Sequence, residues 1–372
     1  MILTAEFVSK GHPDRLCDAI VNEIVNYVVL KDKDALCGLE CAVHTNKVFV
    51  DGRIAAGKDE KVIDEEKIKE IVREVYHNAG YGEGSHGDAS WNPFPENLEI
   101  ILDVCIELLS DDERKLRQYS DDQNVVNGYA IDSKETDYLP VEHYVALRLG
   151  QALNHNLLTS WYDRKYFGPD FKILVQLNEK NGKYSWERLT LSVQHIRGRE
   201  FRKIYDNRIW EMNFVLKGLF KNTRFSSLAE IDEEHFFLNG AGDFVQGGPE
   251  GDNGLSGKKL CIDFYGPSIP IGGGAIYGKD PHKIDVCGAL RARELAVKLV
   301  KEHGYHSVFT TLAWSPGEMA PHIIEAYEID IFGTKIPIDK SLLPAKDYFS
   351  IECINNDLKL SERKTTSIKD IK

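Results

Sequence analysis

The densest set of side chains that could do chemistry lies between Phe244 and Asp285, in two glycine-rich loops. Glycine lets a backbone approach a ligand closely, and successive exposed N–H groups form a concave site for anions. Lysines bind phosphates as point charges, and carboxylates are hard oxygen ligands for Mg²⁺. The segment therefore predicts a site for a polyphosphate and a metal ion. Its charged candidates are Lys258, Lys259, Lys279, Lys283, Asp252, Asp280 and Asp285.

The alternative is a solvated surface loop, because a single glycine-rich loop with a lysine is a common pattern. Two such loops in tandem weaken that alternative, and a third cluster lies near the N-terminus, from Phe7 to Arg15. Pro13 suits the first position of a helix, and apolar residues then recur at spacings of three and four. His12 and Asp14 are thus expected at a helix N-terminus, where backbone N–H groups favour anions. Asp14 alone could equally be a partner of the helix dipole.

Four segments carry a resemblance to a known family. Residues 6–20, EFVSKGHPDRLCDAI, resemble the ESVSEGHPDKI signature of S-adenosylmethionine synthetases. Residues 244–259 resemble that family's RFVIGGPxGDxGLTGRK segment, and residues 272–285, GGGAIYGKDPHKID, resemble GGGAFSGKDPxKVD. Residues 168–172 resemble RPDxK. The segments keep the family's order, and the resemblance covers roughly residues 1–330.

The resemblance implies an α/β fold of three similar sheet-plus-helix units related by a pseudo-threefold axis. It also implies a homodimer with active sites between subunits, in some cases paired into a tetramer. We expect an N-terminal unit over residues 1–100, an active-site lid at 101–120, a central unit at 121–243 and a C-terminal unit at 244–372.

The reaction implied by the resemblance is methionine adenosyltransfer. The sulfur of L-methionine attacks C5′ of ATP, and the expelled triphosphate is cleaved to pyrophosphate and phosphate. Negative charge on the leaving group makes preorganised cations the expected catalytic device. The implied cofactors are two Mg²⁺ ions, bound by Asp14 and Asp285, and K⁺, bound by Glu40. The residues matching the family's catalytic positions are His12, Lys172, Lys258, Lys259, Lys279 and Asp285.

Further positions match residues near ATP and methionine, namely Asp122, Asp170, Phe244, Asp252 and Lys283. Phe244 matches an aromatic residue that stacks on adenine, yet it could equally be a core residue. Asp122 follows another aspartate and could be only solvated, and Glu40 could be an ordinary surface charge.

The departures from the family concern the methionine pocket. Arg53 stands where the family has the glutamate that holds the methionine ammonium, which reverses the charge. Leu109 stands near the position of the family's QSPD glutamine, which removes an amide. Lys258 replaces an arginine and loses its bidentate fork, so we expect weaker triphosphate cleavage. The entrance at residues 119–124 carries acidic residues in place of glycines.

Three functions are compatible with this pattern. The first is methionine adenosyltransferase activity with a rebuilt methionine pocket. The second keeps the fold and accepts another thioether or mainly hydrolyses triphosphate, as Arg53 and Leu109 suggest. The third is a non-catalytic binding subunit, suggested by the altered entrance and by the absence of the family's terminal segment after Leu358.

Composition excludes several classes of protein. The net charge of −13 argues against a nucleic-acid surface. No apolar run is long enough to span a bilayer, and no signal peptide is recognisable, so we expect a cytoplasmic enzyme without a membrane partner. The seven cysteines include one pair four residues apart and no second pair, which disfavours zinc.

Periodicity and turn residues predict the coarse secondary structure around these motifs. Besides the helix from Pro13, helices are expected at 65–80 and 285–303. Strands are expected at 42–50, 98–107, 172–177, 188–194 and 259–264, and a loop at 81–95.

Overall fold

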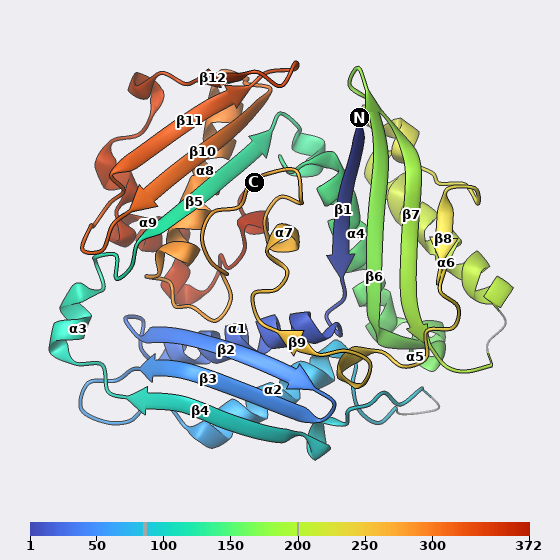
Figure 1. The fold of residues 1–372 in the computed structure, drawn as a ribbon, viewed down its shortest axis with the longest axis horizontal. Helices are drawn as coiled ribbons and strands as arrows, with labels where there is room; N and C mark the ends of the chain where they lie inside the picture. The colour runs from blue at the N-terminus through green and yellow to red at the C-terminus, as the bar shows by residue number, and fades with distance from the viewer. Residues whose placement is uncertain (85–87, 199–200) are drawn as a thin grey trace.

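The computed structural model describes residues 1–84, 88–198 and 201–372. Within these residues, twelve strands form three four-stranded sheets arranged around the centre of the molecule (Figure 1). Helices cover one face of each sheet. This confirms the predicted α/β architecture of three sheet-plus-helix units.

The first unit contains the helix that begins at the HPD motif. Its sheet has the spatial order β4 (Glu99–Glu107), β3 (Lys47–Ala55), β2 (Leu36–His44) and β9 (Gly254–Leu255). The covering helices are α1 (Pro13–Lys31) and α2 (Glu65–Ala79). Apolar side chains along one side of each helix, such as Leu16, Ile20, Ile68 and Val72, are fully buried in one hydrophobic core.

The second unit occupies the middle of the chain and is closed by the first strand. Its sheet has the order β1 (Ile2–Val8), β6 (Phe167–Lys180), β7 (Lys183–His195) and β8 (Phe236–Leu238). Its helices are α4 (Val141–Thr159), α5 (Trp161–Tyr166) and α6 (Phe201–Phe220). Strands β6 and β7 form a long antiparallel hairpin, from Phe171 paired with Val193 to Lys180 paired with Lys183.

The third unit is built mainly from the C-terminal part of the chain. Its sheet has the order β12 (Lys335–Pro337), β11 (Ile323–Ile329), β10 (Ser307–Trp314) and β5 (Asn124–Ile131). Its helices are α8 (Ile284–His303) and α9 (Ile351–Leu358). Its buried residues belong to the same hydrophobic core as those of the second unit, whereas the first unit has a core of its own.

The sheets do not follow consecutive segments of the chain. Strand β1 pairs with β6, β5 pairs with β10, and β9 pairs with β2. Each unit therefore includes a strand from outside the segment expected for it at residues 1–100, 121–243 or 244–372. The two short helices α3 (Asp111–Leu116) and α7 (Leu260–Asp263) lie on connections between units.

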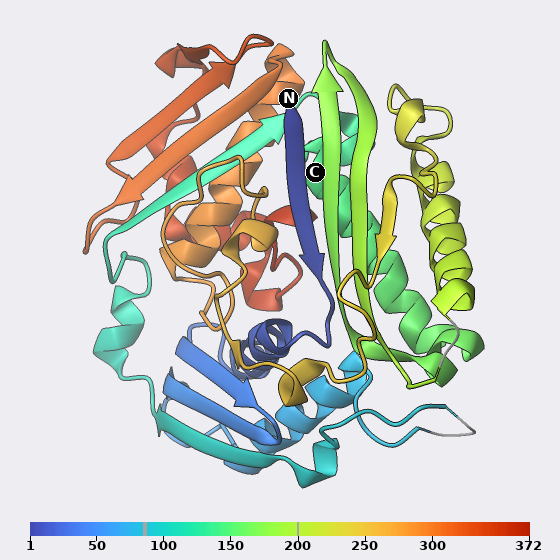
Figure 2. The same cartoon turned by 45° about the vertical axis from the view of Figure 1, so that its right-hand side comes forward.

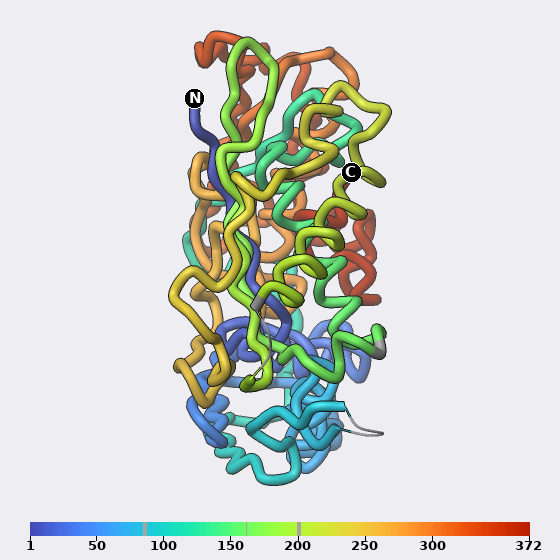
Figure 3. The backbone as a smooth tube through the Cα atoms, turned by 90° about the vertical axis from the view of Figure 1, so that its right-hand side faces the viewer, coloured from blue at the N-terminus to red at the C-terminus, as the bar shows by residue number. Residues whose placement is uncertain are grey.

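The three sheets lie toward one broad side of the molecule and most of the helices toward the other (Figures 2 and 3). The long connection around α7, which carries the glycine-rich loops, lies on the sheet side (Figures 1 and 3). In β4 every second side chain is exposed, as expected for a sheet with one covered and one open face.

Most of the predicted elements agree with the structure, and two differ. The helix expected to begin at Pro13 is α1, and those expected at 65–80 and 285–303 are α2 and α8. The strand expected at 98–107 is confirmed as β4. The expected strand at 42–50 is wrong, because the chain turns at Thr45, whose φ is 52°, and forms the β2–β3 hairpin. The expected strand at 259–264 is also wrong, because Leu260–Asp263 forms the helix α7. The predicted 81–95 loop is irregular where it is described, and residues 85–87 lie outside the described part.

The packing of α8 on β5 requires a residue without a side chain. A Cβ atom on Gly128 would lie 2.0 Å from the carbonyl oxygen of Ala292 in α8. We therefore expect Gly128→Ala to lower the free energy of unfolding by at least ~2 kcal/mol, because helix and sheet must separate. Urea unfolding would measure this.

Gly218→Ala is the matched control, because a Cβ atom there meets no atom within 4 Å on helix α6. It should raise the free energy of unfolding by ~0.5–1 kcal/mol through helix propensity alone. Equal effects of the two substitutions would contradict the packing argument.

Candidate active site

His12 caps the N-terminus of α1, with Pro13 at the first helical position, as predicted. Its Nδ1 accepts a hydrogen bond from the backbone N–H of Asp14 at 3.2 Å, so the ring proton belongs on Nε2. Nε2 is buried and has no hydrogen-bond partner within the structure. His12 lines a cavity of about 370 Å³. The imidazole thus offers one N–H donor to that cavity.

Burial and the nearby charge of Lys172 lower the pKa of His12 from 6.5 to about 4. The ring is therefore neutral at physiological pH. A neutral imidazole can donate a hydrogen bond to a developing anion without carrying a charge of its own.

Asp14 lies in the first turn of α1, two residues after His12, and connects the helix to the first glycine-rich loop. Its carboxylate accepts a hydrogen bond from the backbone N–H of Leu255 at 3.0 Å. The ammonium of Lys259 lies 3.0 Å from it, and that of Lys258 lies 3.7 Å away. Burial opposes ionisation of Asp14, but the Leu255 N–H and Lys259 keep its pKa below the ordinary value. Two lysines are thus held beside one buried carboxylate.

Asp170 lies in the same cavity and joins β6 to the first glycine-rich loop. One carboxylate oxygen accepts from the backbone N–H of Gly248 at 2.8 Å, and the other is buried without a partner. Burial raises the pKa of Asp170 from 3.8 to about 6. Lys172, Asp252 and Phe244 complete this side of the cavity. Phe244 belongs to neither hydrophobic core among the described residues, so its ring is a wall of the cavity.

A second group of predicted residues lines a larger cavity of about 730 Å³. Lys279 lies 3.0 Å from Asp285, whose carboxylate also accepts from the backbone N–H of Gly274 at 2.8 Å. Asp122 lines this cavity as well, and its carboxylate accepts from the backbone N–H of Gln123. Lys283, at the N-terminus of α8, forms an ion pair with Asp121.

The two groups lie at different points along one edge of strand β2. Lys279 bridges to Gly38 at one point of β2, and Leu255, which binds Asp14, pairs with Ala42 four residues further along. Four residues of strand span about 13 Å. The two cavities share no lining residue. Glu40 lies between the groups on β2, where its carboxylate accepts from the hydroxyl of Ser256. One chain thus presents two separate groups of candidate residues, which are called below the His12 half-site and the Lys279 half-site.

Arg53 and Leu109, the two departures from the family pattern, lie in different environments. Arg53 on β3 donates to Glu107 at 3.0 Å and to Glu113 of helix α3 at 2.7 Å, so two carboxylates surround its charge. Leu109 is only 1% exposed, so its side chain does not line an open pocket. The half-exposed cluster of Arg53 with its two glutamates is the chemically distinctive feature of this end of the sheet.

The structure corrects one candidate metal ligand. Asp280 is fully buried; it forms an ion pair with Arg117 and accepts from the backbone N–H groups of Cys37 and His282. Both of its oxygens are occupied, so it positions the second glycine-rich loop rather than binding a cation. Across the described ranges, no three His, Cys, Asp or Glu side chains converge in a way that could hold a metal ion by themselves.

Sequence reasoning missed three groups of residues near the half-sites. Arg117 has no local signal, because its partner lies 163 residues away. Glu107 and Glu113 have no local sequence signal either. Their contacts with Arg53 depend on the pairing of β3 with β4 and on the position of α3, which follows β4. Asp18 could have been found: it lies four residues after Asp14 on the same helix face, and it accepts from the backbone N–H of Gly257 at 2.9 Å.

Comparisons with known proteins agree with this arrangement. Residues 1–92 match the N-terminal domain of S-adenosylmethionine synthetase, and residues 246–369 match its C-terminal domain. The S-adenosylmethionine synthase of Nitratiruptor sp. is 30% identical, over 94% of this chain and 86% of that protein. That of Clostridium botulinum is 31% identical, over 91% and 84%.

A solved structure described as an unusual S-adenosylmethionine synthetase from Campylobacter jejuni has the same fold. It superposes with a TM-score of 0.80 at 22% identity, covering 100% of this chain and 93% of that one. None of the helices in the described ranges is long and apolar enough to cross a membrane.

The raised pKa of Asp170 gives a test of the His12 half-site. Because the pKa in the folded state, about 6, exceeds the ordinary value of 3.8, ionisation of this group costs folding free energy as pH rises through that window. Asp170→Asn removes that titration. The stability of the variant relative to the unchanged protein should therefore rise by ~2 kcal/mol between pH 4.5 and pH 7, as measured by urea unfolding.

Asp243→Asn, at an exposed carboxylate on the rim of the same cavity, is the control and should show no such trend. If the free energy of unfolding of Asp170→Asn differed from that of the unchanged protein by the same amount at every pH, the carboxylate would not be buried in solution.

Proposed function

Because the chain belongs to the S-adenosylmethionine synthetase family, we propose that it is a methionine adenosyltransferase acting on ATP and L-methionine. The methionine sulfur forms a bond to C5′ of ATP, and the C5′–O bond breaks with its electron pair leaving on the triphosphate. The triphosphate is then hydrolysed to pyrophosphate and phosphate. Sulfur is a neutral nucleophile, so no general base is required for the first step.

The observation that carries this proposal is the His12 half-site. A neutral, buried N–H donor with no partner faces a cavity whose charged neighbours include Lys172. The ammonium groups of Lys258 and Lys259, from the first glycine-rich loop, lie beside the carboxylate of Asp14. A preorganised donor and fixed cations stabilise negative charge as it develops on a leaving oxygen, and they do so without reorganisation.

The carboxylates suit Mg²⁺ only together with a phosphate ligand. Mg²⁺ is usually bound by one or two carboxylates plus substrate phosphates, and each half-site offers one well-placed aspartate. Asp14 and Asp285 would hold the two ions, which neutralise phosphate charge when bound. Glu40, beside the Ser256 hydroxyl, would hold K⁺.

The remaining residues would bind the rest of the substrates. The unpaired oxygen of Asp170 suits a ribose hydroxyl, and the Phe244 ring beside it suits a stacked adenine. Lys279, Lys283, Asp252 and Asp122 would contact the phosphates or the amino acid from the loops. Arg53 and its glutamates would lie near the methionine end.

We propose further that a complete site combines the half-sites of two chains. The His12 and Lys279 groups line separate cavities on one chain, and the open faces of all three sheets carry exposed apolar side chains that favour burial against a partner. These residues are Phe49, Ile101, Val125, Phe237, Leu255, Ile323 and Ile336. The proposed assembly is a homodimer, which could pair further into a tetramer.

A second candidate function rests on the cluster of Arg53, Glu107 and Glu113. A reversed charge at Arg53, with two carboxylates beside it, could change which thioether is accepted, or leave triphosphate hydrolysis as the main reaction. A panel of methionine analogues separates this from the first proposal, because a clear preference for methionine would exclude it.

Lys279→Met tests the catalytic assignment. It removes one cation from the triphosphate, so kcat/KM should fall by at least ~10²-fold. Mass spectrometry of S-adenosylmethionine, pyrophosphate and phosphate, with ATP, Mg²⁺, K⁺ and methionine supplied, would measure the loss. Lys298→Met, on the exposed side of α8, is the matched control and should keep full activity. A folded, unchanged chain that forms no sulfonium would instead indicate the non-catalytic subunit.

Complementation tests the assembly. Lys259→Met and Lys279→Met damage opposite half-sites, so each alone should be inactive. A mixed dimer of the two variants would contain one site with both lysines intact. Random assembly makes half of the dimers mixed, and each mixed dimer has one intact site of two. About a quarter of the normal activity should therefore return. If no activity returns, although mixed dimers are shown to form, each site is built from a single chain.

A further inference from the structure

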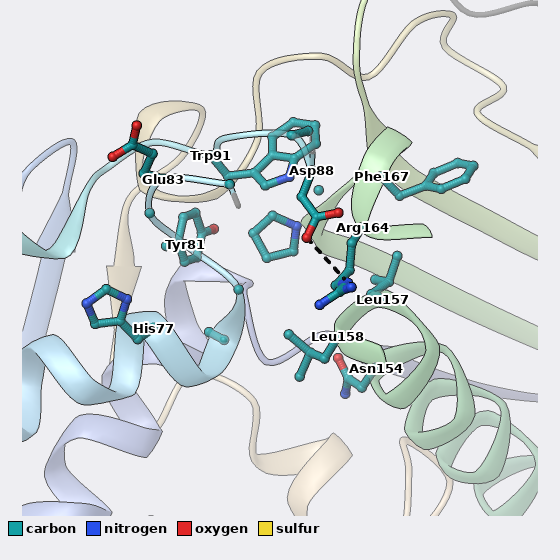
Figure 4. A pocket seen from close by; sticks show the side chains of 17 residues that line it. His77, Tyr81, Glu83, Asp88, Trp91, Asn154, Leu157, Leu158, Arg164 and Phe167 are labelled. Atoms are coloured by element: carbon teal, nitrogen blue, oxygen red, sulfur yellow. Dashed lines mark ion pairs between the residues drawn. The ribbon is translucent and has the colours of Figure 1, made fainter. Parts of the chain in front are cut away.

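A second cavity lies away from both half-sites, at the seam between the first and second units (Figure 4). Its volume is about 230 Å³. One wall is formed by the end of α2 and by residues 80–84 and 88–91, and the other by α4, α5 and the start of β6. The proposed reaction uses none of the side chains that point into this cavity.

The two walls carry opposite charges. Asp88, from the loop of the first unit, faces Arg164, from helix α5 of the second unit (Figure 4). Arg164 Nε lies 3.5 Å from the Asp88 carboxylate. That is longer than the 2.7–2.9 Å typical of a charge-assisted hydrogen bond. The two groups form an ion pair that a ligand with both charges could replace with two shorter contacts.

Part of the remaining lining is apolar. Leu157 and Leu158 from α4 and Trp91 from the loop contribute to it, and the amide of Asn154 lies beside the leucines (Figure 4). Glu83 and His77 add polar groups on the side of the first unit. An apolar surface beside a pair of opposite charges is suited to a molecule that has both charges and a hydrocarbon side chain. The volume is below the usual range for drug-sized ligands and excludes a nucleotide.

We propose that this cavity binds a free α-amino acid with an apolar side chain, in its zwitterionic form. Its carboxylate would pair with Arg164 and its ammonium with Asp88, inserting between the two groups. Its side chain would lie on Leu157 and Leu158. The proposal does not depend on the reaction assigned to the two half-sites.

Occupation of the cavity would be felt at the His12 half-site. The hydroxyl of Tyr81, another lining residue, donates to the carbonyl oxygen of Gly11 at 2.6 Å, next to His12. Pro169 lines the cavity, and the following residue, Asp170, holds the first glycine-rich loop through Gly248. The ligand would thus pack against the backbone that positions two groups of the proposed active site.

The test compares charges on otherwise matched probes. L-leucine and L-phenylalanine would be titrated calorimetrically into the full chain without ATP. The comparison probes are 4-methylpentanoate and 3-phenylpropanoate, which lack the ammonium, and 3-methylbutylamine and 2-phenylethylamine, which lack the carboxylate. Because each charged contact contributes substantially to affinity, the amino acids should bind at least about tenfold more tightly than either single-charge analogue.

Two variants locate the binding. Arg164→Met should lower affinity for the amino acids by about tenfold or more, whereas Arg202→Met, at an exposed arginine of α6 that also pairs with carboxylates, should not. Asp88→Asn should weaken binding of the amino acids and leave binding of the carboxylates unchanged or stronger. Arg53→Met, at the end proposed for methionine, should leave binding of leucine intact, which separates this site from the proposed active site.

The proposal is overturned if the amino acids bind no more tightly than the single-charge analogues, or if Arg164→Met binds them like the unchanged protein. Either result would identify the Asp88–Arg164 pair as a structural contact between units only.

Discussion

Hydrogen bonds from loop N–H groups to helix and strand carboxylates are the interactions on which the rest of the site depends. Leu255, Gly257, Gly248 and Gly274 each donate a backbone N–H to one aspartate. The acceptors are Asp14, Asp18, Asp170 and Asp285, respectively. Much of the connection from Gly248 to Gly274 has no regular secondary structure of its own, so these contacts fix its course. Charge-assisted hydrogen bonds of this kind are about twice as strong as neutral ones.

Several carboxylates also reduce the electrostatic repulsion among the lysines that lie close together in the proposed phosphate-binding region. In a chain with a net charge of −13, the half-sites still concentrate ammonium groups. Lys259 faces Asp14, Lys279 faces Asp285 and Lys283 faces Asp121. Under the proposed function, Asp14 and Asp285 would exchange their lysines for a metal ion when phosphate binds, which requires no large movement of the backbone.

Local patterns in the sequence predicted the helices and the motifs that begin at their N-termini, because caps and periodicity are local properties. Short apolar runs were less reliable: residues 259–264 are compatible with a strand or a helix turn, and the helix was selected by packing. Thr45 carries no glycine signal for its turn. The strand partners of β1, β5 and β9, and the relation of Arg53 to Glu113 or of Arg117 to Asp280, depend on contacts distant in sequence, which no local pattern contains.

The exchanged strands also determine when the chain can begin to fold during synthesis. The first strand, Ile2–Val8, pairs only with Phe167–Lys180, so it has no partner until nearly half of the chain has left the ribosome. The first sheet is not complete until Gly254 and Leu255 have emerged. Closing such long loops before their contacts form is entropically costly and slows folding. The nascent chain therefore exposes its N-terminal strand without a partner for nearly half of its synthesis.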